Sequence, residues 1–109
     1  MNLANFKRRL KVGVKLACIF HQESAGRDEK GVTIYVDKDR GIREVSIVQT
    51  NSFALKTQKT DGTWHDVWCE MPKASECKFP DENTIVIHEQ DYRQPDTKPL
   101  IPILTYRFV

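Results

Sequence analysis

The stretch VTIYVDKDRGIREVSIVQ, residues 32–49, decides the fold class of this chain. Its two ends, residues 32–36 and 42–49, are rich in β-branched and aromatic side chains, which favour extended strands. The middle segment, DKDRG at 37–41, holds the Asp and Gly residues that are typical of turns. The stretch therefore predicts a β-hairpin with a five-residue connection.

The segments on either side of this hairpin also favour strands. Upstream, residues 14–20 alternate in polarity as a half-buried strand does, and the polar residues 22–30 predict a loop. Downstream, further strands are expected at 53–57, 64–69, 77–79, 84–89 and 103–109, with a turn at Asp61-Gly62 and a 3₁₀ turn at 72–75. Many short strands without a βαβ pattern indicate antiparallel pairing.

The first residues predict a short helix. Asn2 is a suitable N-cap, and Leu3, Phe6 and Leu10 follow the spacing of one helical stripe, so a helix is expected at 2–10. Together the elements predict an α+β fold that is mainly antiparallel β. In this fold the short N-terminal helix precedes a small SH3-like barrel or a strongly bent sheet.

The length of 109 residues suits one domain, so residues 1–109 are expected to form a single unit. The helix at 2–10 would then precede a β domain at 14–109. Within this β domain, the segment 22–40, which begins with the polar residues 22–30, and the proline-rich segment 90–102 are interpreted as variable insertions.

Cysteine usage and hydropathy predict a cytoplasmic location. Three cysteines, an odd number, suit a reducing compartment better than a secreted scaffold. No apolar run approaches the roughly 20 residues needed to cross a bilayer. The N-terminal segment has basic residues before an apolar patch, but Lys11 and Lys15 interrupt that patch, unlike the apolar region of a secretory signal. No contact with a membrane is expected.

Three blocks of the sequence are familiar together: NFKRRLKVGVKL at 5–16, REVSIVQTNSFALKT at 43–57 and WCEMPKASECKF at 68–79. The chain resembles short uncharacterised proteins of bacteriophages and prophages of Gram-positive bacteria, in which a basic helix precedes a small β domain. The resemblance implies a phage origin and action in the cytoplasm of an infected bacterial host. Such small proteins often bind host machinery, as anti-CRISPR proteins that disable a Cas nuclease do. The family has no established activity and assigns no site residues.

Motifs for catalysis or metal binding are weak. His65 and Cys69 share a strand face, but no C-x₂-C pair accompanies them, so no metal site is expected. The segment 37–41 begins like a calcium loop and lacks its later ligands. There is no G-x-S-x-G motif, and the glycines are too isolated for a phosphate loop. The sequence therefore predicts a protein that is not an enzyme and holds no cofactor.

Charge is uneven along the chain although the net charge is only +2. The first 20 residues carry five bases and no acid, and such a cluster is suited to phosphate contacts. This gives an alternative function as a small nucleic-acid-binding module, with exposed aromatic rings as base-stacking platforms. The residues assigned to this alternative site are Lys7, Arg8, Arg9, Lys11 and Lys15.

The C-terminal half is acidic, with nine acids and five bases in residues 61–109. On an inhibitor, carboxylates can imitate the phosphates that a nuclease channel attracts. Trp64 and Trp68 share one face of the expected strand, where they are either core or anchors for a partner, and burial is the favoured reading. The acids assigned to a protein-binding surface are Asp61, Asp66, Glu70, Asp81, Glu82 and Glu89.

The leading functional prediction is a non-enzymatic phage-type protein that binds and obstructs a host protein. An inhibitor of host defence, such as an anti-CRISPR protein acting on a Cas nuclease, is the concrete case. Nucleic-acid binding by the basic helix is the first alternative, and an accessory or structural phage component is the second. The sequence leaves the oligomeric state open.

Overall fold

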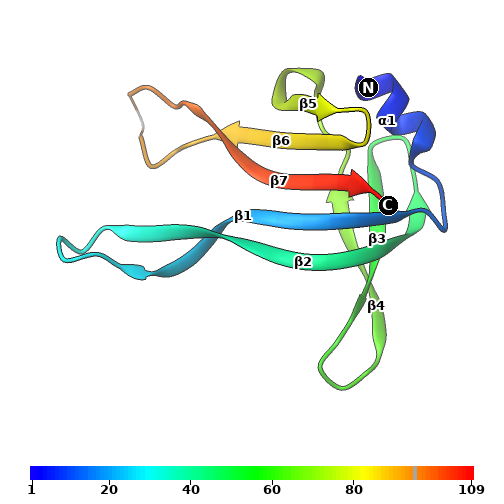
Figure 1. Cartoon of the computed structure of the whole chain (residues 1–109), viewed down its shortest axis with the longest axis horizontal. Helices are drawn as coiled ribbons and strands as arrows, with labels where there is room; N and C mark the ends of the chain where they lie inside the picture. The colour runs from blue at the N-terminus through cyan, green and yellow to red at the C-terminus, as the bar shows by residue number, and fades with distance from the viewer. Residues whose placement is uncertain (95) are drawn as a thin grey trace.

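Seven antiparallel strands form one sheet beside a short helix in the structure, a computed structural model that describes residues 1–94 and 96–109 (Figure 1). The strands follow the spatial order β4-β3-β2-β1-β7-β6-β5. The elements are α1 (Leu3–Arg9), β1 (Lys15–Arg27), β2 (Thr33–Val48), β3 (Ser52–Gln58), β4 (Trp64–Glu70), the 3₁₀ turn η1 (Ala74–Glu76), β5 (Cys77–Asp81), β6 (Thr84–Gln90) and β7 (Leu100–Phe108).

The helix at 2–10 is confirmed, and its start is fixed by a capping box. The Asn5 amide donates to Asn2 Oδ1 at 2.8 Å, and the Asn2 amide donates to Asn5 Oδ1 at 3.1 Å. Seven residues are too few for a stable isolated helix, so tertiary packing must hold it. Phe6 and Leu10 provide this packing because both are buried in the core.

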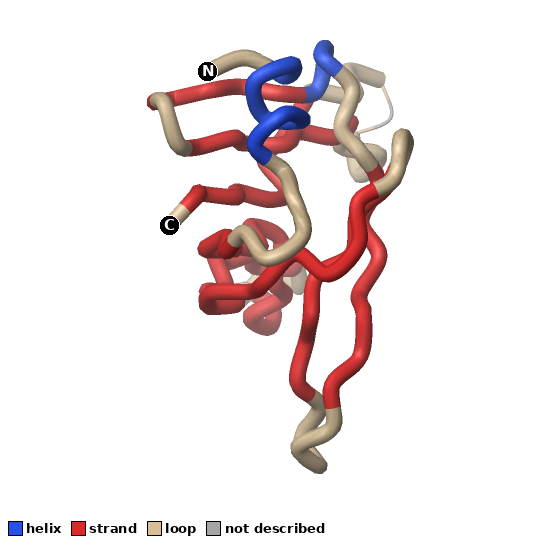
Figure 2. Tube along the Cα trace, turned by 90° about the vertical axis from the view of Figure 1, so that its right-hand side faces the viewer, coloured by secondary structure: helices blue, strands red, loops and turns tan. Residues whose placement is uncertain are grey.

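The sheet is strongly bent, and it is not closed into a barrel. β2 causes the bend, because its first part pairs with β1 and its last part, from Val45, pairs with β3. A register shift between Val45 and Ile47 lies at the change of partner. The β3–β4 hairpin therefore runs across the other strands and projects below the body (Figures 1 and 2).

The core lies on the concave side of this bent sheet, beneath α1. Phe53 is central to it, since its ring makes edge contacts with Phe6 at 6.5 Å and with Tyr106 at 5.8 Å between centroids. Edge-to-face arrangements of this kind stabilise aromatic clusters. The buried cluster consists of Phe6, Leu10, Leu16, Cys18, Val45, Phe53, Leu55, Ile85, Ile87 and Tyr106.

The turn predicted at 37–41 is wrong, because these residues continue β2. Asp39 and Gly41 pair with Ile19 and Cys18, which are adjacent in the chain, so Arg40 is an extra residue in the ladder. Gly41 has a φ of 74°, and its amide donates to Asp39 Oδ1 at 2.7 Å. The Asp and Gly residues thus form a β-bulge, which requires the same backbone flexibility as a turn.

The loop predicted at 22–30 is also wrong. β1 continues to Arg27, and the hairpin turns at 28–32, where Asp28 Oδ1 accepts the amides of Lys30 and Val32. The two strands form a long arm that projects from the body (Figure 1). Polar residues can form this arm because ladder hydrogen bonds do not require a buried face.

The segment 90–102 contains the connection from β6 to β7 and the first residues of β7. β6 ends at Gln90 and β7 begins at Leu100, three residues before the predicted start of the last strand. The buried carboxylate of Asp91 holds the start of the connection, since it accepts hydrogen bonds from Arg93 and Gln94. The part of this prediction that concerns Pro95 lies outside the described residues.

Candidate binding surface

Both tryptophans are exposed on the outward face of β4. Trp64 exposes 64% of its surface and Trp68 exposes 51%, while His65, Val67 and Cys69 between and beside them turn inward. The expectation that these tryptophans belong to the core is therefore wrong. The reason is that β4 is an edge strand of a hairpin that projects beyond the body, so no layer covers its outward face.

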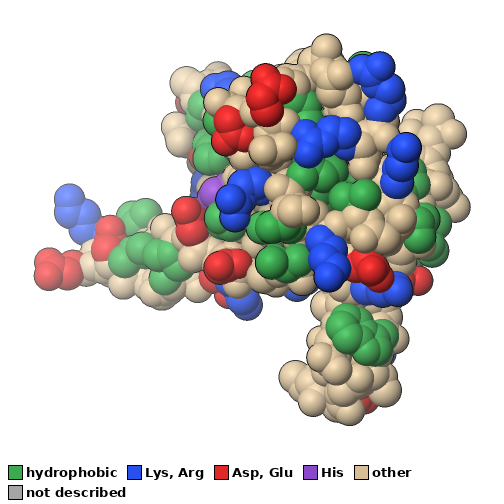
Figure 3. Space-filling model, turned by 45° about the vertical axis from the view of Figure 1, so that its right-hand side comes forward, with side chains coloured by type: hydrophobic (Ala, Val, Ile, Leu, Met, Phe, Trp, Pro, Cys, Tyr) green, Lys and Arg blue, Asp and Glu red, His purple; other side chains and the backbone are tan. Residues whose placement is uncertain are grey.

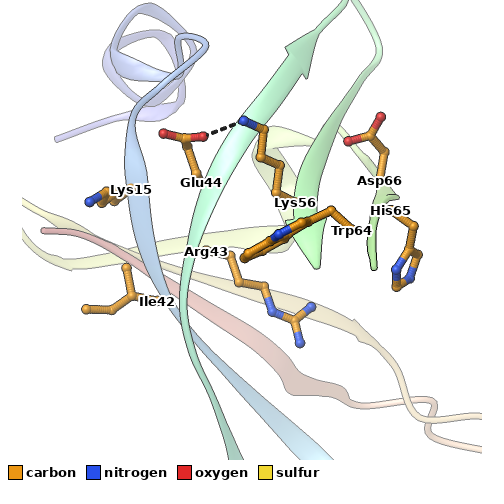
Figure 4. Close-up of a pocket in the computed structure, with 8 residues that line it drawn as sticks. All are labelled: Lys15, Ile42, Arg43, Glu44, Lys56, Trp64, His65 and Asp66. Carbon is orange, nitrogen blue, oxygen red and sulfur yellow. Dashed lines mark ion pairs between the residues drawn. The ribbon is translucent and has the colours of Figure 1, made fainter. Parts of the chain in front are cut away.

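A groove of about 620 Å³ lies beside Trp64 (Figure 4). Across it, Lys56 Nζ and Glu44 Oε2 form an ion pair of 2.8 Å. This contact lowers the pKa of Glu44 and raises that of Lys56, since hydrogen bonding and charge favour the ionised forms. The lining residues come from β1 to β4 and are Lys15, Ile42, Arg43, Glu44, Lys56, Trp64, His65 and Asp66.

Two cations of this groove keep their charge available. In the part of the chain that the structure describes, Lys15 and Arg43 form no ion pair, whereas Lys56 is paired and Asp66 accepts a hydrogen bond of 2.7 Å from Ser46 Oγ. An aromatic ring with neighbouring cations can bind a planar or anionic group.

A second groove, of about 350 Å³, opens between the edge of β4 and the strands β6 and β7. Its apolar part includes Tyr106, whose hydroxyl donates to Cys69 Sγ at 3.6 Å. Apolar residues of this lining are Val67, Trp68, Cys69, Met71, Pro72, Ile87, Leu104 and Tyr106, and charged ones are Glu70, Glu76, Glu89, Arg40 and Lys73. The groove thus combines an apolar interior with charges of both signs.

The thiols around this region are poor nucleophiles. Burial raises the pKa of Cys18 to about 11, although Arg43 and Arg40 oppose the shift. Burial likewise raises the pKa of Cys69 and of Cys77. These thiols are protonated at neutral pH, and the thiolate is the reactive form of cysteine.

The five basic residues assigned to a nucleic-acid surface lie at different places and do not share one role. Arg9 holds the fold together, because its guanidinium donates to the Glu82 carbonyl at 2.7 Å and to Asn83 Oδ1 at 2.9 Å. Lys15 lines the groove beside Trp64, and Lys7 lines another hollow together with Met71. Arg8 and Lys11 are exposed. Figure 3 shows Lys and Arg side chains dispersed among apolar and acidic ones rather than in one patch.

The six acids are also divided among several places. Asp66 and Glu70 lie on the outward face of β4, and Glu89 lines the second groove together with Glu70. These three carboxylates therefore belong to one side of the molecule, around the free edge of β4.

The other acids lie elsewhere. Asp61 is in the β3–β4 turn, where hydrogen bonds from Thr63 lower its pKa. Asp81 ends β5 and Glu82 begins the β5–β6 turn beside α1, where Glu82 Oε2 lies 3.4 Å from the amino group of Met1. Their positions suit turn formation and helix anchoring.

Among the residues that the structure describes, no three side chains of His, Cys, Asp or Glu come together as a metal-ligand group. No helix in the same part of the chain is long and apolar enough to span a membrane.

The sequence patterns did not indicate the residues that β2 and β3 supply to the groove beside Trp64, above all Arg43 and Lys56. One signal was present. A turn at Asp61-Gly62 makes the flanking strands a hairpin, and the register of this hairpin places Lys56 opposite Asp66. Nothing local indicated Arg43, because its position depends on the bend of β2.

No protein-family model matches the chain, and no curated protein or solved structure is significantly similar to it.

Proposed function

We propose that this chain is a non-enzymatic protein that binds a protein partner through the outward face of the β3–β4 hairpin. The exposure of Trp64 and Trp68 on one face of an edge strand carries the proposal. Tryptophan is enriched among the residues that dominate binding energy at interfaces. The two residues stand four positions apart, about 13 Å along an extended strand, so one partner can contact both.

The charges that alternate with the tryptophans favour a protein over a nucleic acid. Asp66 and Glu70 alternate with Trp64 and Trp68 along the same face. Carboxylates there would repel a phosphate backbone, and they would attract Lys or Arg side chains of a protein.

The partner that we propose is a host protein of a phage-infected bacterium, with a defence nuclease as the concrete case. The sequence resemblance supports this part of the proposal. The acids around β4, which are Asp66, Glu70 and Glu89, would then face basic residues that normally contact nucleic acid.

The test is affinity capture from bacterial lysate with three immobilised forms of the protein. The first is the wild type, the second is the Trp64→Ala, Trp68→Ala variant, and the third is Tyr92→Ala as a matched control. Tyr92 is 72% exposed, lies in the β6–β7 connection and lines neither groove beside β4. We expect one host protein to be retained by wild type and control and lost by the double variant. Equal retention by all three forms contradicts the proposal.

The second measurement uses fluorescence, because Trp64 and Trp68 are the only tryptophans in the chain. Their emission should shift to shorter wavelength when the captured protein is added, since binding removes water from the rings. An unchanged emission spectrum under conditions in which the complex forms would place the interface elsewhere.

A second candidate function is binding of single-stranded nucleic acid in the groove beside Trp64. Lys15 and Arg43 line this groove, and neither forms an ion pair with any residue that the structure describes. Its test is retention of a labelled oligonucleotide at several salt concentrations. The Lys15→Glu, Arg43→Glu variant should lose retention, whereas the Arg27→Glu, Lys30→Glu control on the arm should keep it. Retention that does not depend on salt or on these variants rejects this candidate.

A further inference from the structure

The edge of β4 has the features of a strand that can pair with another chain. β4 is the last strand of the sheet on its side, and it pairs with β3 over all seven residues without a register shift. It contains neither proline nor lysine, the residues that natural proteins use to block an edge.

The opposite edge of the sheet is protected. β5 has five residues and a register shift between Lys78 and Asp81, and it includes Pro80, which has no amide hydrogen. Of these two end strands, β4 is therefore the one suited to strand pairing.

The free backbone groups of β4 belong to its outward residues. The amide of Met71 donates to the Asn51 carbonyl at 2.9 Å, and that of Lys59 donates to the Thr63 carbonyl at 2.7 Å. Hydrogen-bonded pairs alternate along an antiparallel ladder, so the odd-numbered residues of β4 bond to β3. The amides and carbonyls of Trp64, Asp66, Trp68 and Glu70 therefore point away from the sheet.

The groove of about 350 Å³ lies on the inner side of the same edge. Val67, Trp68, Cys69 and Glu70 line it from β4, with Val67 and Cys69 on the less exposed face of the strand. Ile87 and Leu104 line it from β6 and β7. A strand placed beside β4 would direct every second side chain into this groove, where an apolar residue would be removed from water.

From this arrangement we infer that an extended segment of the protein partner adds to β4 as a further strand, with alternating apolar and basic residues. The inference rests on the proposed function and names its mode of recognition, which is backbone pairing with side-chain pockets. Apolar residues of the segment enter the groove, and basic residues lie on the outward face.

Charge complementarity places the basic residues of the added segment opposite the outward side chains of β4. The outward side chains of β4 are two tryptophans and two acids, Asp66 and Glu70. A Lys or Arg opposite them gains both an ion pair and contact with an aromatic face. A second copy of this chain is a poor occupant, because pairing β4 with another β4 supplies no cation to these acids.

The test uses synthetic seven-residue peptides of alternating arginine and leucine with blocked ends, added to the full chain. Binding is followed by tryptophan emission, and backbone pairing is followed by hydrogen exchange of the β4 amides. We expect exchange at Asp66 and Trp68 to slow about tenfold or more at saturating peptide, because these amides gain hydrogen bonds. The matched peptide with glutamate in place of arginine should bind at least tenfold more weakly, roughly the effect of 1.4 kcal/mol.

A second pair of peptides isolates the backbone contribution. N-methyl groups are placed on the arginine amides of one peptide and on the leucine amides of the other. Only one set of amides faces β4 in a paired strand, so one peptide should lose binding and the other should keep it.

Three results would overturn the inference. If the peptide changes the tryptophan emission and the β4 amides exchange as fast as before, the peptide binds the tryptophan surface without adding as a strand. Equal affinity of the two methylated peptides would likewise show that the peptide backbone does not pair with β4. Protection of these amides without peptide, together with dimerisation in sedimentation, assigns the edge to a second copy. Failure of the proposed function is seen separately, in the lysate capture with the tryptophan variants.

Discussion

The guanidinium of Arg9 lies over the ring of Phe108, with its central carbon 4.1 Å from the ring centroid. Together with its hydrogen bonds to Glu82 and Asn83, this contact ties α1 to β7 and to the β5–β6 turn. A short helix depends on such contacts, because it cannot be stable alone.

Replacement of Arg9 by alanine should therefore lower the free energy of unfolding by about 1 kcal/mol, since it removes the hydrogen bonds and the ring contact. The matched control is Arg8→Ala, which changes a neighbouring exposed arginine and should have an effect within about 0.5 kcal/mol of zero. Urea unfolding followed by circular dichroism measures both. Equal stability of the two variants would show that Arg9 does not hold the helix.

Large apolar residues of this chain should differ sharply in their effect on stability. Phe53→Leu should cost about 2 kcal/mol, because Phe53 is fully buried and contacts two aromatic rings. Trp64→Leu should cost less than about 0.5 kcal/mol, because Trp64 is exposed. Chemical denaturation measures both values. A large cost at Trp64 would mean that the tryptophan packs into the fold, which would remove the basis for the proposed binding surface.

The bulge in β2 should make Gly41 sensitive to substitution. Its φ of 74° disfavours a side chain, although no atom lies within 4 Å of the position that a Cβ would take. Gly41→Ala should therefore destabilise the protein by about 1–2 kcal/mol through backbone strain alone. Gly41→Asn should cost less, because Asn tolerates this conformation better. If the two variants had the same stability as the wild type, the bulge would not be rigid.

Stability should decline at alkaline pH because of the buried thiol of Cys18. Its pKa is about 11 in the folded protein, above the usual 9.0, so the unfolded chain ionises first as the pH rises. The contribution is fully present below pH 9.0 and is lost as the pH rises toward about 11. Unfolding of wild type and Cys18→Ala at pH 8 to 11 measures this. The variant should be less stable at pH 8 and should depend less on pH, and an unchanged slope would contradict the assignment.

Local patterns predicted the helix and the strand-rich character of this chain correctly, because both depend on neighbours in sequence. The spacing of Leu3, Phe6 and Leu10 and the cap at Asn2 are features of a few consecutive residues. The turn at Asp61-Gly62 likewise lies where the sequence placed it, between β3 and β4.

Errors arose where one local signal has two structural outcomes. Asp39 and Gly41 signal a backbone irregularity, which is a turn between two strands or a bulge within one. The bulge forms here because the long strand β1 supplies pairing partners to β2 on both sides of Gly41. That partner strand could not be seen from residues 37–41.

The sequence by itself determined which side chains alternate along β4 and which residues form the helix, since strand and helix periods are properties of the local backbone. Only the tertiary structure decided that the outward face of β4 is open, that Arg9 is structural, and that Arg43 and Lys15 line one groove with Trp64. These outcomes depend on the bend of β2 and on the order of strands across the sheet. Such long-range pairing is set by the whole chain and has no counterpart in any single stretch of residues.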